Sequence, residues 1–422
     1  MRIFIAGADG FIGRHLAAAL ARRGHDVVAG VRRPRGGAAR REIAFDFAVD
    51  HDPEIWRPRL AGIDVAINAV GILRESRRAR FDDVHTRGPI ALFQACARGG
   101  VRVVQISALG AEADAPSRYH ASKHAADAAL LALAADAIVV QPGLVFGPGG
   151  ASATFFTHLA VLPLIPYPDT RGARIQPIHV DDLVAGIVRV VERPLAAPAR
   201  RLRLVGPRAL DWREFLGALR RALGLGRARL ATLPLPLMRA VATVAKRVPR
   251  SLLDRETLAL LGRDNVAPVT GTRRLLGRGP RAPEAFIDPD DAPRERRVAR
   301  LDWLLLLLRL ALAAMWLGTA WVSLFEFPRS DSDTLLAALG LTGDAARLAL
   351  YGGAGLDAIF GMLALPGFGG RRTWLAQIAL VLAYTALITW RLPAFWVHPF
   401  APVLKNVPIL AALFLLAVLD ED

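Results

Sequence analysis

Tyr119 and Lys123 stand four positions apart in the segment 119–123, which reads YHASK. On a helix, residues with this spacing share one face, so the lysine ammonium would lie beside the tyrosine phenol. We expect the positive charge to stabilise the phenolate and lower the pKa of Tyr119, so that the phenol exchanges a proton near neutral pH. The chain has only four tyrosines and three lysines, which makes this pair uncommon by chance. The alternative is a surface pair on a helix.

Ser107 is a third candidate for chemistry, because it follows an apolar run of strand length at 101–106. A hydroxyl at the end of the strand before the Tyr119 helix would hydrogen-bond a carbonyl or hydroxyl of a substrate. We therefore predict Ser107, Tyr119 and Lys123 as a catalytic set. The alternative for Ser107 is a polar residue that only ends a strand.

A glycine-rich turn, GADGFIG at 7–13, lies between the first apolar run and the first helical stretch. Without side chains, the backbone can turn tightly and approach a pyrophosphate, while the helix N-terminus offers free N–H groups. This context predicts a dinucleotide site. The residues expected to contact the dinucleotide are Gly7, Gly10, Phe11, Ile12 and Gly13.

The end of the second strand bears on the choice between NAD and NADP. An acidic residue there binds the ribose 2′-hydroxyl, whereas an arginine accepts a 2′-phosphate. The chain has Val31-Arg32-Arg33-Pro34 at this place and no carboxylate nearby. We therefore expect NADP(H), with Arg32 on the 2′-phosphate, and keep NAD(H) as the alternative.

The elements that would position these residues alternate along the chain. Apolar runs of strand length lie at 2–6, 26–31, 65–69, 101–106 and 137–141, and helical stretches lie at 15–23, 83–97 and 117–135. Strands buried on both faces that alternate with helices predict a Rossmann-like α/β fold with a doubly wound parallel sheet.

Beyond residue 150 the alternation becomes looser. Helical stretches are expected at 181–192, 212–223 and 235–245, and the Gly-, Pro-, Asp- and Arg-rich segment 277–300 is typical of a linker.

Four apolar runs follow, at 303–325, 348–365, 374–390 and 403–419. Crossing a bilayer takes roughly 20 apolar residues, with about 17 as the lower limit. We expect four transmembrane helices, with a buried helical bundle as the alternative. Arginines before the first run and between the second and third place these segments, the N-terminal domain and the C-terminus in the cytosol. These arginines are Arg294, Arg296, Arg297, Arg300, Arg371 and Arg372.

Composition limits the other classes of function. Apolar residues make up 53% of the 422 and the mean hydropathy is +0.32, values that exclude a disordered chain. The formal charge of +16 comes almost wholly from scattered arginines without basic-aromatic interleaving, so no nucleic-acid partner is expected. The single cysteine, Cys96, excludes an intrachain disulfide and a cysteine-rich metal site, and no metal is expected. No charged-then-apolar leader precedes the first strand, so the N-terminal domain is expected to stay in the cytosol.

Together these motifs resemble the short-chain dehydrogenase/reductase superfamily, in its extended or atypical branch. Further matching segments are Asp46-Phe47, Asn68-Ala69-Val70-Gly71, QPGLVFGP at 141–148 and IHVDD at 178–182. The resemblance implies that Tyr119 and Lys123 also contact the cofactor, with Lys123 on its ribose. It also implies cofactor contacts from Asp46 and Phe47 to adenine, from Ala69 and Val70 along the cofactor path, and from Pro142 near the nicotinamide. We interpret His179 and Asp181 as structural, with Asp181 or Asp182 capping the next helix.

Two departures from the extended branch concern the substrate. Ser107 and Tyr119 are only 12 positions apart, and residues 108–118 lack a Tyr-Gly turn, which argues against a nucleotide-sugar substrate. This segment is more similar to the atypical group that includes the NADPH-binding accessory subunit of respiratory complex I. That similarity implies a second possibility, a protein that holds the nucleotide without turning it over.

The C-terminal part resembles the DoxX-like membrane family, which has four spans. The match rests on His398-Pro399-Phe400 and on Lys405-Asn406 before the last run. Ionisable groups inside spans usually face a bundle interior, so Asp357 and Arg309 form a candidate internal pair. Snorkelling or interfacial positions are the alternative.

Three functions remain open at this point. The first is a membrane-tethered NADP(H)-dependent oxidoreductase, with Tyr119 as general acid/base, Lys123 as its pKa tuner and Ser107 as the orienter of a small, lipid-soluble carbonyl or alcohol. The second is a nucleotide-holding structural or assembly protein of a membrane complex, and the third is an epimerase or dehydratase with tightly held NAD.

The expected organisation has four parts. They are a nucleotide-binding domain at 1–150, a substrate lobe that shares part of the sheet at 151–280, a linker at 281–300 and a membrane domain at 301–422. We expect an integral protein of a bacterial inner membrane, and the sequence predicts no particular protein partner.

Overall fold

The computed structural model describes residues 1–36, 41–133, 136–170, 172–193, 200–234, 236–238, 258 and 260–420. The chain divides into two compact units, one made of residues 1–246 and 251–299 and the other of residues 247–250 and 300–422. The helix expected at 235–245 falls mostly outside the described residues.

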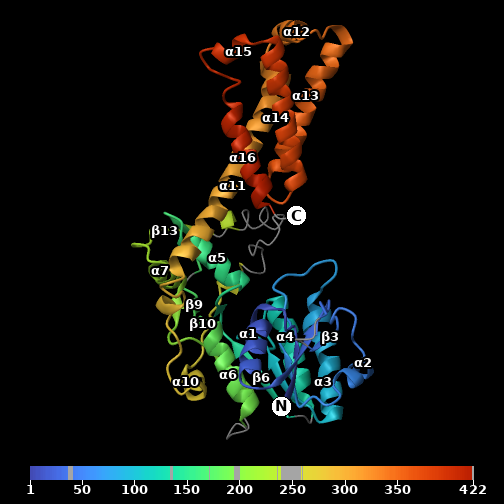
Figure 1. Cartoon of the computed structure of the whole chain (residues 1–422). Helices are drawn as coiled ribbons and strands as arrows, with labels where there is room; N and C mark the ends of the chain where they lie inside the picture. Colours follow the sequence, from blue (N-terminus) through green and yellow to red (C-terminus); the bar gives the residue numbers. More distant parts are fainter. Residues whose placement is uncertain are drawn as a thin grey trace. The chain divides into compact units, whose positions relative to one another are not determined.

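A seven-stranded sheet forms the centre of the first unit, in the order β11-β6-β5-β4-β1-β2-β3 (Figure 1). All neighbouring strands pair in parallel. This confirms the predicted doubly wound parallel sheet. The strands are β1 (Arg2–Ala6), β2 (Asp26–Val31), β3 (Arg41–Ala44), β4 (Val65–Asn68), β5 (Arg102–Ile106), β6 (Ala137–Pro142) and β11 (Arg201–Leu204).

Helices cover both faces of this sheet, because alternate side chains of each strand point to opposite sides. Ile3 and Ile5 of β1 pack in one buried cluster with α1 (Phe11–Arg22) and α6 (Val180–Glu192). Phe4 of β1 packs in a second cluster on the other face. That face is covered by α2 (Pro53–Arg59), α3 (Gly88–Gly99), preceded by the π-helical turn η1 (Asp82–Arg87), and α4 (Arg118–Ala132).

Short elements build the lobe after β6. Paired strands are β7 (Val145–Phe146) with β10 (Ile178–His179), β8 (Ile165–Pro168) with β13 (Leu230–Leu233), and β9 (Arg174–Ile175) with β12 (Leu210–Asp211). The helices are α5 (Ala151–Ala160), α7 (Trp212–Ala222), α10 (Thr270–Leu276) and the 3-10 turn η2 (Pro283–Ala285). The range expected to be a linker thus contains η2 and the beginning of the next helix.

The cap of α6 differs from the expectation that Asp181 or Asp182 supplies it. The side chain of His179 accepts a hydrogen bond from the backbone N–H of Asp181 at 3.2 Å and caps the helix. Asp182 is fully buried, and its carboxylate accepts hydrogen bonds from the Arg278 guanidinium at 2.5 Å and the Arg281 backbone N–H at 2.6 Å. It therefore ties the segment around residues 278–281 to α6.

The second unit is helical. Its helices are α11 (Ala292–Trp321), which begins in the first unit, η3 (Val322–Glu326), α12 (Arg329–Ala338), α13 (Gly343–Ala364), α14 (Arg371–Arg391), α15 (Ala394–Val397) and α16 (Asn406–Leu419). Buried Leu312, Trp316, Phe360, Trp374 and Leu413 form its core. Among the described residues, Ala292–Glu326 and Arg371–Arg391 are long and apolar enough to cross a membrane. The count of four spans stays a prediction.

The predicted pair of Arg309 with Asp357 is wrong. The Arg309 guanidinium pairs with Asp420, 111 positions away, and lies over the Trp374 ring at 5.0 Å. The Trp374 indole N–H also donates to Asp420. Asp357 is buried on α13, and its Oδ1 has no hydrogen-bond partner among the described residues.

Candidate functional site

The candidate site residues gather at one edge of the main sheet. Gly7, Arg32, Ala69 and Ser107 directly follow β1, β2, β4 and β5, and Asp46 lies two positions after the end of β3. Because the strands are parallel, these carboxyl ends lie at the same edge, where open α/β sheets bind their ligands.

The glycine turn is held by close backbone packing. Gly7 adopts a left-handed φ of +78°, and a Cβ on it would meet Val70 Cγ2 at 3.0 Å. A Cβ on Gly13 would overlap the carbonyl of Gly7 and lie 2.8 Å from its carbon atom. The first turn of α1 can therefore lie directly against the end of β1 because Gly13 lacks a side chain, and the segment after β4 can approach the turn because Gly7 lacks one.

The N-terminus of α1 is suited to a phosphate. Gly10 is its cap residue and supplies no side-chain hydrogen bond, and the first turn carries no acidic residue. Free N–H groups and the positive end of the helix dipole therefore face the edge where the strands end. The side chains of Phe11 and Ile12 are half-buried beside this turn.

Arg32, Asp46 and Phe47 occupy different environments at the same edge. Arg32 is exposed, and no hydrogen bond or ion pair engages its guanidinium within the described part of the chain. The Asp46 carboxylate accepts from the backbone N–H of Ala48 at 3.0 Å. Phe47 is 2% exposed and packs against Phe45 and Trp56, so only its backbone is available to an adenine.

Lys123 reaches the ends of two strands. It is 3% exposed, and its Nζ donates to the carbonyl of Val70 at 3.0 Å and to that of Ile106 at 3.2 Å. Burial lowers the pKa of Lys123 to about 8, and the nearby Asp127 carboxylate opposes this shift. The lysine thus fixes α4 against the segment after β4, where Ala69 and Val70 are half-buried.

Tyr119 does not have the lowered pKa that its spacing from Lys123 predicts. Its ring packs against Phe81, His85 and His120, with centroid separations of 6.1, 5.4 and 5.2 Å. Burial, with a smaller contribution from the Asp127 charge, raises the pKa of Tyr119 to about 12. Burial of the phenol therefore decides its pKa, and the Lys123 ammonium is hydrogen-bonded to two backbone carbonyls.

Ser107 is turned toward a residue that sequence reasoning missed. Its hydroxyl, 5% exposed, donates to Oδ2 of Asp127 at 2.5 Å. Asp127 is fully buried, and its Oδ1 has no partner among the described residues. With its only proton given to Asp127, Ser107 offers lone pairs alone to a substrate. The spacing of four between Lys123 and Asp127 was the available signal.

His85 is a second residue that sequence reasoning missed, and no motif marks it. Its Nε2 accepts the backbone N–H of Ile72 at 3.0 Å, and its Nδ1 lies 3.0 Å from Ser122 Oγ, which itself donates to the carbonyl of Tyr119. Burial and the nearby Lys123 lower the pKa of His85 to about 2. The neutral ring therefore donates through Nδ1 and links the segment after β4 to α4.

Pro142 ends β6 and is buried, and its carbonyl accepts the backbone N–H of Leu109 at 2.9 Å. This contact fixes the chain just after Ser107. The predicted contact of Pro142 with a nicotinamide stays a prediction.

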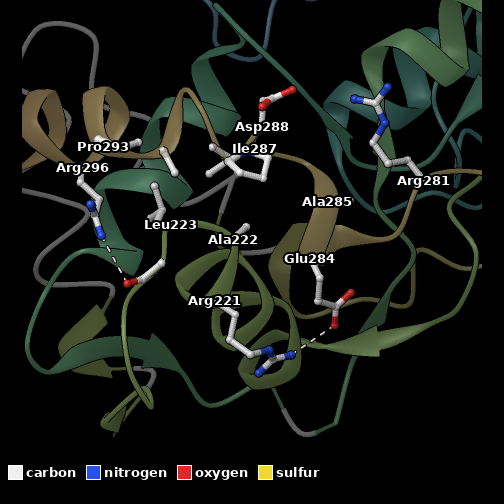
Figure 2. A pocket seen from close by; sticks show the side chains of 13 residues that line it. Arg221, Ala222, Leu223, Arg281, Glu284, Ala285, Ile287, Asp288, Pro293 and Arg296 are labelled. Atoms are coloured by element: carbon white, nitrogen blue, oxygen red, sulfur yellow. Dashed lines mark hydrogen bonds and ion pairs between the residues drawn. The ribbon is translucent and has the colours of Figure 1, made fainter.

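A cavity of about 590 Å³ lies elsewhere in the first unit, between the end of α7, the segment around η2 and the beginning of α11 (Figure 2). In Figure 2 the Arg221 guanidinium points to Glu284, at 3.2 Å, and that of Arg296 to the carbonyl of Gly224, at 3.3 Å. Both guanidinium groups are therefore hydrogen-bonded to other parts of the protein. None of the predicted site residues lines this cavity.

Comparison with known families adds two matches. Residues 3–206 match the NAD dependent epimerase/dehydratase family, and residues 313–414 match the DoxX-like family. A ceramide reductase of Caulobacter vibrioides is 30% identical over 248 residues, which cover 56% of this chain and 74% of that protein.

Two further likenesses bear on the first unit. Subunit 9 of the NADH dehydrogenase (ubiquinone) 1 alpha subcomplex of Arabidopsis thaliana is 27% identical over 251 residues, 56% of this chain and 61% of that protein. The crystal structure of a nucleoside-diphosphate-sugar epimerase from Staphylococcus aureus has a TM-score of 0.55 at 17% identity, and the match covers 68% of this chain and 99% of that one. At this identity the structural likeness concerns the fold alone.

Proposed function

Because the chain belongs to the NAD-dependent epimerase/dehydratase family and carries a DoxX-like membrane domain, we propose that it is a membrane-tethered oxidoreductase acting on a lipid-soluble carbonyl or alcohol with NADP(H). The observation that carries the proposal is the position of Tyr119 and Lys123. Lys123 bonds to the carbonyl of Val70, the residue that packs against Gly7 of the glycine turn. Lys123, one helical turn after Tyr119, therefore contacts the segment that packs against the glycine turn, and this supports the proposal.

Each residue has a role in this proposal. The backbone N–H groups at the start of α1 bind the pyrophosphate, and Arg32 binds the 2′-phosphate. Bound NADPH would supply a hydride to the carbonyl carbon. Tyr119 donates its phenolic proton to the carbonyl oxygen, and Ser107 accepts a hydrogen bond from the hydroxyl that results. Lys123 holds the ribose side of the site.

The substrate class is inferred from two supports. The relative with 30% identity is named a ceramide reductase, and ceramide is a lipid. The chain itself carries apolar helices after the first unit. We therefore propose a long-chain ketone or a comparable carbonyl that partitions into the bilayer, reduced at the cytosolic side of an inner membrane.

A nucleotide-holding protein is the second candidate, favoured by the environment of Tyr119. A phenol with a pKa of about 12 is a weak acid, and the Lys123 ammonium is bonded to backbone carbonyls. The likeness to the NADH dehydrogenase subunit agrees with this alternative. The third possibility, an epimerase or dehydratase, is supported by the family match and by the likeness in fold.

The decisive experiment measures NADPH binding and NADPH oxidation by the full chain in lipid nanodiscs, with quinones, long-chain ketones and short ketones as substrates. We expect turnover with an apolar ketone, and a decrease of about 10²–10⁴ in Tyr119→Phe with NADPH affinity retained. Binding without turnover on any carbonyl would support the holding protein instead. Turnover unchanged in Tyr119→Phe would exclude Tyr119 as the proton donor.

A further inference from the structure

Asp127 is a buried acid in the middle of the candidate site to which no role has yet been given. It lies on α4, one helical turn after Lys123, and is completely shielded from solvent. One carboxylate oxygen accepts the Ser107 proton at 2.5 Å, while the other has no partner among the described residues. A carboxylate is costly to bury unless a nearby charge compensates it.

We propose that Asp127 is a positioning residue of this site, whose carboxylate keeps the buried Lys123 in its ammonium form. The two side chains are i and i+4 on one helix, the spacing at which opposite charges face each other. The inference rests on the proposed function, because the ammonium matters for binding NADP(H) at the ribose.

The surroundings of Lys123 make Asp127 its compensating charge. His85, from η1, is neutral because burial and Lys123 lower its pKa. Tyr119, on α4 itself, is a neutral phenol because burial raises its pKa. Burial raises the pKa of Asp127 overall, and the Ser107 hydrogen bond, the Lys123 charge and, to a smaller extent, Arg201 on β11 oppose this shift.

Ser107 gives Asp127 its orientation. Ser107 directly follows β5, and its hydroxyl holds the Asp127 carboxylate by a hydrogen bond. Lys123 donates to the carbonyl of Ile106, the last residue of the same strand. Replacing Asp127 by Asn would remove the charge and leave a group of the same shape.

The test is the pH dependence of NADPH binding to the full chain in nanodiscs, followed by NADPH fluorescence between pH 6 and 10. In the wild type, affinity should fall as pH rises through about 8, where Lys123 loses its proton. A nearby opposite charge shifts a pKa by about 1–3 units, so Asp127→Asn should lower the midpoint by about one to two pH units. Asp127→Ser is a second neutral variant in case one of the two does not fold.

Matched variants identify the cause. Asp127→Glu keeps the carboxylate, and its midpoint should stay within about half a unit of the wild type. Asp136→Asn removes an exposed carboxylate that pairs with Arg102 at 3.4 Å and should change nothing. Lys123→Met should abolish the transition. Equal midpoints in Asp127→Asn and the wild type, or an equal shift in Asp127→Glu, would overturn the proposal.

A second readout separates this inference from the proposed function. If the wild type binds no NADPH, the proposed function fails. The role of Asp127 is then tested by measuring stability against thermal unfolding as a function of pH. A lysine with a folded pKa below its unfolded value binds more protons when unfolded, so stability rises with pH above the folded pKa. This rise should begin near pH 8 in the wild type and at a lower pH in Asp127→Asn. Coincident profiles would refute the role of Asp127.

Discussion

Gly13→Ala should disable the nucleotide cradle by moving α1. A Cβ at this position would lie 2.8 Å from the carbonyl carbon of Gly7, whereas ordinary contact begins at 3.4 Å, so the helix must retreat by at least 0.6 Å. The overlap with the Gly7 oxygen demands a larger shift. Overpacking of this kind costs about 1–3 kcal/mol of stability.

We expect a larger effect on the affinity for NADPH than on stability. Each charge-assisted hydrogen bond from the α1 N-terminus to the pyrophosphate contributes about 1.5–3 kcal/mol, and losing one weakens binding about 10- to 150-fold. Since the whole first turn moves, we expect a loss of about 100-fold or more. Calorimetric titration of the full chain, well below the unfolding temperature of the variant, measures it.

Gly99→Ala, at the end of α3, is the matched control. A Cβ there meets Val101 Cγ2 at 3.7 Å, an ordinary contact, and Gly99 does not have a positive φ. This variant should bind NADPH like the wild type. If Gly13→Ala bound NADPH within about threefold of the wild type, the close approach of α1 to β1 would not be what forms the cradle.

Three further expectations follow from single features. Arg32→Asp should weaken NADPH binding about 10- to 150-fold and NADH binding little, because Arg32 is exposed and its loss breaks no contact with the described residues. Equal losses of affinity for both cofactors in paired titrations would refute the 2′-phosphate assignment. Cys96 is fully buried and burial raises the pKa of its thiol to about 12, so a maleimide should label it only after denaturation, and rapid native labelling would contradict the packing of α3. Reporter fusions after Ser330, Gly370 and Pro393 should report outside, inside and outside, and any other order would mean that one of the apolar helices does not cross.

The main sheet and the glycine turn could be predicted because their signals are local. Strands β1, β2, β4, β5 and β6 are short apolar runs, and the turn at 7–13 follows the first of them directly, whereas β3 carries Arg41 and Glu42 and shows no such run. The two-residue strands of the lobe, such as β7 and β10, carry no such pattern. Their pairing depends on contacts between segments more than thirty residues apart.

The environment of the Tyr–Lys pair could not be predicted from spacing. The spacing puts Tyr119 and Lys123 on one face, but it does not say that the ends of β4 and β5 supply carbonyls for the ammonium. Burial of the phenol then decides its pKa. Similarly, Arg309 and Asp420 are 111 positions apart, and only the packing of α11, α14 and the C-terminal segment brings them together.

The pairing of β11 with β6 has a consequence for biosynthesis. While the ribosome is still making the segment between them, β6 has β5 on one side and an unpaired edge on the other, and its residues 137–140 are all apolar. Exposed edges of this kind pair readily with other chains, so the nascent protein is open to aggregation or to chaperone binding until residues 201–204 emerge. A fragment that stops near residue 150 keeps that edge uncovered permanently, and the nucleotide-binding half is therefore poorly suited to expression without the lobe that follows it.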